Sequence, residues 1–149
     1  SSAASDVYKR QIINGGNLVT PHFAVKSVSE ADGTAVEFNY EIQSNAIEEK
    51  TSLMMKDILR QVVEEGGGKK AYLEGFSIGG KTATSQKLPR GSGKYISSFI
   101  GFSPVDNAKV IAMCLIDEPQ GIYYGGTIAA PVIRELFENI LPYLEIQNN

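Results

Sequence analysis

The chain has 149 residues, 42% of them hydrophobic, which fits one domain or part of one and is enough to bury a core. Its 17 acidic and 14 basic residues leave a net charge of -3, which does not favour binding to the negatively charged backbone of nucleic acid. No apolar run approaches the roughly 20 residues that cross a bilayer, so we expect no membrane segment in this sequence.

Residues 1–11 differ from the rest of the chain. They show no hydrophobic periodicity, no initiating Met and no apolar signal-peptide core. We expect them to be an extraneous, adapter-derived tail; a short native helix remnant is the alternative. The folded part is then expected to run from Ile12 to Asn149, without an internal repeat or a low-complexity linker.

The first structured segment is predicted to be a β-hairpin. Asn14–Asn17 is rich in turn formers and leads into an extended stretch at Leu18–Thr20. Phe23–Val28 and Ala35–Tyr40 have strand-like alternation, and Ala31–Thr34 between them contains an Asp-Gly pair typical of tight turns. These two strands are expected to pair with each other.

Two helices are predicted from apolar residues spaced three and four apart. The first spans about Ile47 to Val63 and is expected to end at Gly66–Gly68, where glycine allows left-handed backbone. The second runs over Thr127–Leu141, and Pro131 is tolerated because it falls in the first turn.

Three strands are predicted between these helices. They cover Ile78–Gln86, Tyr95–Ser103 and Lys109–Asp117, with a tight turn at Pro104–Asn107. Short connections between consecutive strands favour antiparallel pairing. The predicted fold class is therefore α/β in content (α+β), with an antiparallel sheet flanked by helices.

The single histidine and the single cysteine are predicted to be structural. His22 follows Pro21 at the start of a strand-like run and has no Cys or second His with which to share a metal. Cys114 lies inside an apolar strand and has no partner for an internal disulfide. We expect no metal and no cofactor.

Residues 80–86 are compatible with two unrelated chemistries. Gly75–Thr82 fits the phosphate-loop pattern G-x-x-x-x-G-K-[ST], and Val110–Glu118 looks like the apolar strand ending in an acid found in nucleotidases. Lys81–Thr84 is one residue away from the K-T-G motif of penicillin-binding proteins. A phosphate loop needs a helix starting near Lys81, whereas the residues up to Gly93 are hydroxyl-rich and broken by Pro and Gly. A strand is predicted.

Five pieces of the sequence, in family order, resemble the C-terminal part of a class B penicillin-binding protein. Among subgroups, the chain is most similar to the division and sporulation transpeptidases of Gram-positive bacteria. The five pieces are Asn14–Gly16 with Thr20–Pro21, Val62–Gly66, Gly80–Gln86, Ser98–Pro104 and Tyr123–Pro131.

The resemblance implies a penicillin-binding serine D,D-transpeptidase. Its serine forms an acyl-enzyme with a peptidoglycan stem peptide and expels the terminal D-alanine, and the acyl group then passes to a neighbouring amine. Lys81, Thr82 and Thr84 would bind the substrate carboxylate, with Ala83 and Ser85 beside them. Lys81 would also relay the leaving-group proton, and the Thr84 backbone would donate to the oxyanion. Tyr123, Tyr124, Gly125 and Gly126 are candidate groove residues; for the tyrosines, aromatic packing is the alternative.

Two departures from the family pattern affect the functional hypothesis. Ala83 stands where the family has Gly, with its methyl expected on the same face as Lys81. No S-x-x-K or S-x-N motif precedes Lys81, so we expect a fragment of an incomplete transpeptidase-like domain, inactive by itself, whose missing N-terminal part carries the nucleophile and a membrane anchor. The parent would be held at the outer face of the bacterial cytoplasmic membrane. A D,D-carboxypeptidase fragment and a non-catalytic wall-binding or partner-binding module are the alternatives.

Overall fold

The computed structural model describes residues 11–146, and the chain divides into two compact units between Leu53 and Met54. The predicted tail at residues 1–11 lies almost entirely outside the described residues. Among those described, no helix has the length and apolarity needed to cross a membrane.

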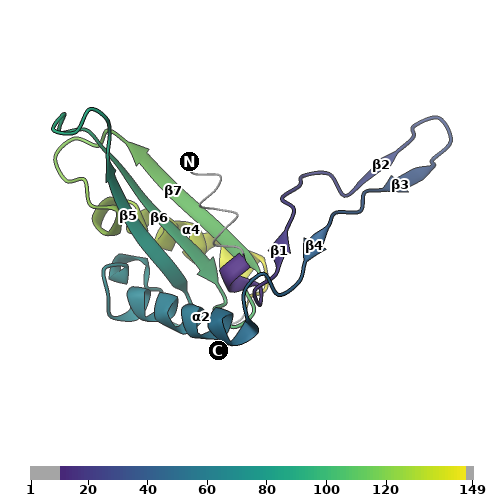
Figure 1. Cartoon of the computed structure of the whole chain (residues 1–149), viewed down its shortest axis with the longest axis horizontal. Helices are drawn as coiled ribbons and strands as arrows, with labels where there is room; N and C mark the ends of the chain where they lie inside the picture. The colour runs from purple at the N-terminus through teal and green to yellow at the C-terminus, as the bar shows by residue number, and fades with distance from the viewer. Residues whose placement is uncertain (1–10, 147–149) are drawn as a thin grey trace. The chain divides into compact units, whose positions relative to one another are not determined.

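The first unit contains the predicted hairpin as a two-stranded ribbon (Figure 1). Strand β2 (Lys26–Val28) pairs antiparallel with β3 (Ala35–Glu37), and β1 (Leu18–Val19) pairs with β4 (Ile42–Gln43). The hairpin is confirmed, but its strands are shorter than predicted. Every residue of β2, β3 and β4 is exposed, so no buried face extends the pairing.

The first predicted helix is α2 (Glu49–Glu64), and its end corrects one expectation. None of the three glycines at 66–68 adopts a positive φ. Gly66 N–H instead donates to Gln61 O (3.1 Å) and Gly68 N–H to Val62 O (2.9 Å). A Cβ on Gly66 or Gly68 would lie 3.0 Å from Val62 backbone atoms. These glycines permit close approach to the helix end rather than left-handed backbone.

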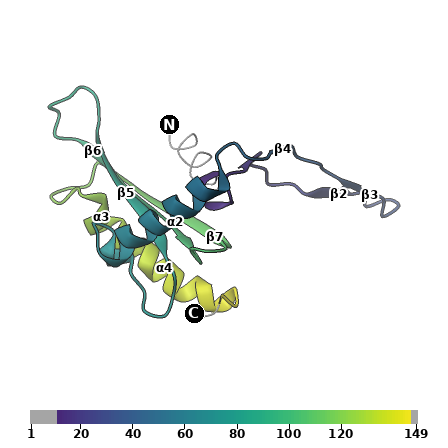
Figure 2. The same ribbon diagram turned by 60° about the horizontal axis from the view of Figure 1, so that its bottom comes forward.

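The second unit is built on a three-stranded antiparallel sheet in the order β5-β6-β7 (Figures 1 and 2). The strands are β5 (Gly79–Gln86), β6 (Tyr95–Ser103) and β7 (Val110–Asp117). Their bounds agree with the predicted strands to within one residue, and the predicted antiparallel pairing is confirmed.

Helix α4 (Ala130–Tyr143) packs across one face of this sheet and forms the main core with it. Gly101 of β6 makes this contact close, since a Cβ there would lie 2.9 Å from Ile133 Cγ2 and 3.2 Å from Phe137 Cε2. The other members of the buried cluster come from α2, the 3-10 turn η1 (Lys69–Ala71), the segment between η1 and β5, β6, and α4 with its flanking residues; they are Val63, Ala71, Leu73, Ile78, Phe99, Ala129, Ala130, Leu141 and Ile146.

The second predicted helix is divided in the structure. A short helix α3 (Gly125–Ile128) precedes α4, and Ala129 separates them. Pro131 lies at the start of α4, as the sequence predicts, because the first helical turn requires no N–H from that position.

Replacing the fully buried Phe137 tests the position of this core. Phe137→Ala should lower the free energy of unfolding by about 3–5 kcal/mol, because it removes a buried ring and leaves a cavity. Leu136→Ala, next to it on α4 and 41% exposed, is the matched control and should cost less than about 1 kcal/mol. Urea unfolding followed by circular dichroism measures both; equal losses would contradict this core.

Candidate functional site

Lys81 lies within strand β5, which confirms the prediction of a strand at this position. Strand β5 is an edge of the sheet, because β6 is its only partner among residues 11–146. The helix that a phosphate loop requires is not there, since the chain stays extended from Gly79 to Gln86. The nucleotidase alternative therefore lacks its defining feature.

The glycines before Lys81 make room for aromatic rings of β6. A Cβ on Gly79 would clash with the ring of Phe102, which lies directly opposite in the strand register. A Cβ on Gly80 would clash with the ring of Phe99. Gly79 and Gly80 belong to the stretch that matches the phosphate-loop pattern, and packing within the sheet explains both glycines.

The register of β5 against β6 determines which backbone groups remain free. Beyond the strand, Lys87 N–H donates to Lys94 O at 2.8 Å, and this pair continues the β5–β6 register. Backbone groups of an antiparallel strand point alternately toward its partner and away from it. The backbone N–H and C=O groups of the odd-numbered residues of β5 therefore point toward β6. The N–H and C=O groups of Thr82 and Thr84 point toward the open edge.

The Lys81 side chain reaches this open edge as well. Its ammonium Nζ donates to Thr82 O at 2.6 Å, and the side chain is exposed. Lys81 makes no ion pair with any carboxylate of residues 11–146. It therefore presents a positive charge that an external carboxylate can neutralise.

Two other lysines, in the connection between β5 and β6, are already neutralised by carboxylates. Lys87 Nζ lies 3.0 Å from Asp117 Oδ1 and 2.8 Å from Glu118 Oε1, and Lys94 Nζ lies 3.1 Å from Glu118 Oε2. Hydrogen bonding to Glu118 raises the pKa of Lys87, and the two lysines lower the pKa of Glu118. Among these three lysines, Lys81 alone lacks a carboxylate partner within the described part of the chain.

The threonine side chains lie on the other face of β5, as alternation predicts. Thr84 Oγ1 accepts a hydrogen bond from Gly125 N–H at 3.1 Å, so its side chain lies under α3. Thr82 faces the same way, because its Cγ2 lies 3.1 Å from where a Cβ on Gly126 would be. Lys81 and the threonines thus meet only at the strand edge.

Ala83 and Ser85 share the face of Lys81. Both are exposed, and Ala83 lies directly opposite Ser98 of β6. The Ala83 methyl therefore stands beside the approach to the Lys81 ammonium and away from α3.

The predicted groove residues occupy two kinds of position. Gly125 and Gly126 are packing positions: a Cβ on Gly125 would clash with the carbonyl oxygens of Ala83 and Ser98, and one on Gly126 with Gly67 O. Gly125 therefore lies directly on β5 and β6, whereas Gly126 lies between Gly67 and the Thr82 side chain of β5.

Tyr123 and Tyr124 form an aromatic cluster with a third tyrosine. Tyr123 stacks on Tyr95 with ring centroids 4.0 Å apart and planes 5° apart, and Tyr124 lies 4.7 Å from Tyr123. Hydrogen bonding to Tyr123 raises the pKa of Tyr124, which is 59% exposed. Tyr95, opposite Gln86, was missed by sequence reasoning because its position beside Tyr123 follows only from the strand register.

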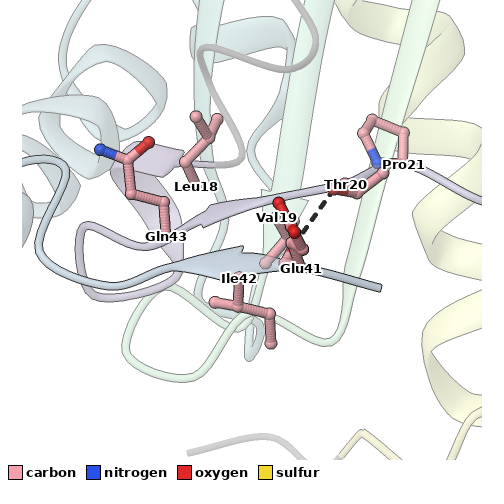
Figure 3. Close-up of a pocket in the computed structure, with 7 residues that line it drawn as sticks. All are labelled: Leu18, Val19, Thr20, Pro21, Glu41, Ile42 and Gln43. Carbon is pink, nitrogen blue, oxygen red and sulfur yellow. Dashed lines mark hydrogen bonds between the residues drawn. The ribbon is translucent and has the colours of Figure 1, made fainter. Parts of the chain in front are cut away.

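A separate pocket in the first unit holds none of the predicted site residues. It lies along β1 and β4, where Thr20 Oγ1 donates to Glu41 O at 3.1 Å (Figure 3). Nearby, the exposed His22 stacks on Tyr40 with ring centroids 3.7 Å apart. No three His, Cys, Asp or Glu side chains gather into a metal-binding group within residues 11–146.

Comparison with known proteins gives one consistent result. The family model described as penicillin binding protein transpeptidase domain matches residues 7–138. Stage V sporulation protein D of Bacillus subtilis is 36% identical over 140 residues, covering 91% of this chain and 22% of that relative. The probable peptidoglycan D,D-transpeptidase PenA of Neisseria flavescens is 35% identical over 126 residues, covering 77% and 32%. The chain thus spans a minor part of these relatives.

A solved structure shows the same fold. Apo penicillin-binding protein 3 of Mycobacterium tuberculosis superposes with a TM-score of 0.82 at 24% identity, over 96% of this chain and 35% of that one. The same protein has also been crystallised with ampicillin, and that complex has a TM-score of 0.82 as well. The α+β fold predicted for this chain is confirmed by the likeness.

Proposed function

We propose, since this chain belongs to the family of penicillin-binding protein transpeptidase domains, that β5 forms one wall of the active site of a serine D,D-transpeptidase. The substrate is the D-alanyl-D-alanine end of a peptidoglycan stem peptide, and β-lactams bind at the same place. The observation that carries this proposal is the open edge of β5, where an ammonium with no carboxylate partner among residues 11–146 lies beside backbone N–H groups that point away from β6.

The terminal carboxylate of the substrate is bound by Lys81 and the two threonines. Lys81 supplies a charge that no described carboxylate neutralises. Thr84 Oγ1 already accepts a hydrogen bond, so its own proton is available to a carboxylate oxygen. Bonds of this kind, with an ionised acceptor, are stronger than bonds between neutral groups.

The oxyanion of the acylation step is stabilised by Thr84 N–H, which the strand register directs to the open edge. The second donor is the N–H of the nucleophile itself. The peptide lies antiparallel along the same edge and pairs with the remaining free groups of β5. Lys81 helps to relay the proton to the leaving amine.

The nucleophile comes from polypeptide outside these residues. No serine in the 149-residue sequence is followed by lysine three positions later. The serine that is acylated and its lysine therefore belong to another part of the domain. The intact protein is proposed to act in cell division or sporulation, at the outer face of the bacterial cytoplasmic membrane and held by an anchor outside this sequence.

One observation favours a second function, a non-catalytic module that binds cell wall or a partner protein. Ala83 adds a methyl beside Lys81, where a flat approach to the strand would suit an acyl group. The module would retain carboxylate recognition by Lys81 and Thr84 while losing acylation. The two functions therefore differ in whether acylation occurs, and both require that Lys81 and Thr84 bind a carboxylate.

Carboxylate recognition is tested with N-acetyl-D-alanyl-D-alanine added to the ¹⁵N-labelled chain. Lys81→Met should weaken binding roughly tenfold, because it removes a charge-assisted hydrogen bond. Lys94→Met is the matched control: Lys94 is also exposed but pairs with Glu118, and its loss should leave the affinity unchanged. Amide shifts at Thr82 and Thr84 report the binding. Equal affinities of both variants would exclude Lys81 from the site.

The source of the nucleophile is tested with labelled penicillin. The isolated chain should form no covalent adduct that survives denaturation, because the acylating serine is absent from its sequence. The same chain expressed together with its upstream coding sequence should be labelled. A stable adduct on the isolated chain would refute this assignment.

The effect of the Ala83 methyl on acylation is tested in the protein that carries the acylating serine. Ala83→Gly should accelerate acylation by penicillin several-fold, because ligand atoms gain room on the face of Lys81. The same change should lower stability by about 0.5–1 kcal/mol, because glycine gives the unfolded strand more freedom. Stopped-flow acylation and thermal unfolding measure the two effects. An unchanged acylation rate would show that the methyl is harmless.

A further inference from the structure

Two hydroxyl groups hold the segment Tyr123–Gly125 across β5 and β6. Thr84 and Ser97 lie directly opposite each other in the strand register. The Ser97 hydroxyl donates to Tyr123 O, and Gly125 N–H donates to Thr84 Oγ1. The segment is thus tied at both ends to one cross-strand pair of side chains.

Ser97 is fully buried, whereas Thr84 lies at the exposed edge. A buried hydroxyl needs a hydrogen-bond partner, and Tyr123 O supplies it. The bond between Ser97 and Tyr123 is therefore shielded from competing water. This bond fixes one end of the segment Tyr123–Gly125. Thr84, which holds the other end, faces the ligand.

The hydrogen bond from Gly125 fixes what the Thr84 hydroxyl can do. Its oxygen accepts the Gly125 proton, so its own proton must be donated elsewhere. Without Gly125 N–H in place, the hydroxyl would rotate among its staggered positions and donate to neighbouring backbone. The position of Gly125 therefore decides whether Thr84 is ready to donate to a carboxylate.

We propose that Ser97 is a positioning residue: by holding Tyr123 it keeps Gly125 N–H on Thr84 and so directs the Thr84 hydroxyl toward the ligand at the open edge of β5. This inference rests on the proposed function, in which Thr84 binds the substrate carboxylate. Ser97 itself does not touch the ligand.

The test is a titration of the ¹⁵N-labelled chain with N-acetyl-D-alanyl-D-alanine. Ser97→Ala should weaken the affinity about five- to tenfold, because Thr84 loses its preferred orientation. Ser103→Ala is the matched control, since Ser103 is also fully buried on β6 and donates to a distant carbonyl, Ser77 O, at 2.9 Å. It should leave the affinity within about twofold. If Ser97→Ala does not fold, Ser97→Cys gives the same comparison with a weaker donor.

A double-mutant cycle distinguishes positioning from general destabilisation. In a Thr84→Val background, Ser97→Ala should cause no further loss of affinity, because Ser97 acts through the Thr84 hydroxyl. Wild-type affinity in Ser97→Ala, or an equal further loss in the Thr84→Val background, would overturn the positioning role while leaving the proposed function standing. A wild-type chain that shows no shifts along β5 would overturn both.

Discussion

The candidate site depends on one constraint, the register of β5 against β6. A shift by one residue would turn the backbone of Thr84 toward β6 and expose that of Ala83. It would also carry the Lys81 side chain to the face covered by α3 and α4. Every functional feature of the edge follows from this alignment: the free Thr84 N–H, the direction of its hydroxyl and the position of the ammonium.

Packing on both faces of the sheet enforces the register. On one face, Gly80 accommodates the ring of Phe99, and on the other face Gly79 accommodates Phe102. Gly125 rests on the carbonyl oxygens of Ala83 and Ser98, which are brought together only in this alignment. Since each contact tolerates no Cβ, a slipped strand would meet a side chain where a glycine is needed. The glycines therefore select the alignment by excluding the alternatives.

The sequence predicted the elements better than their contacts. The three strands of the sheet were placed to within one residue because apolar runs and turn residues bound them clearly. At 66–68 the glycines favour left-handed backbone by residue type, whereas the structure uses Gly66 and Gly68 for close approach to Val62. Close approach between segments leaves no local pattern in a sequence.

The same reason explains what was found and what was missed at the site. Lys81 and Thr84 belong to a motif within one strand, so their neighbourhood can be read from the sequence. Tyr95 and Ser97 belong to β6 and contact residues near 123, so their part depends on the cross-strand register. Alternation along β5 explains why the lysine and the threonines face opposite ways. How they act together depends on the long, flexible lysine side chain, which bends back to Thr82 O.

This division between two faces also limits how Ala83 can affect a ligand. Backbone donors at the edge of a strand lie in the plane of the sheet, whereas side chains stand roughly perpendicular to it. The Ala83 methyl projects on the face of Lys81 and leaves the direction of Thr84 N–H clear. A peptide backbone that pairs with β5 in the plane of the sheet therefore meets no obstacle. Only ligand groups that rise above the plane beside the ammonium meet the methyl, so Ala83 should discriminate between ligands by their bulk on that face rather than by their ability to pair with the strand.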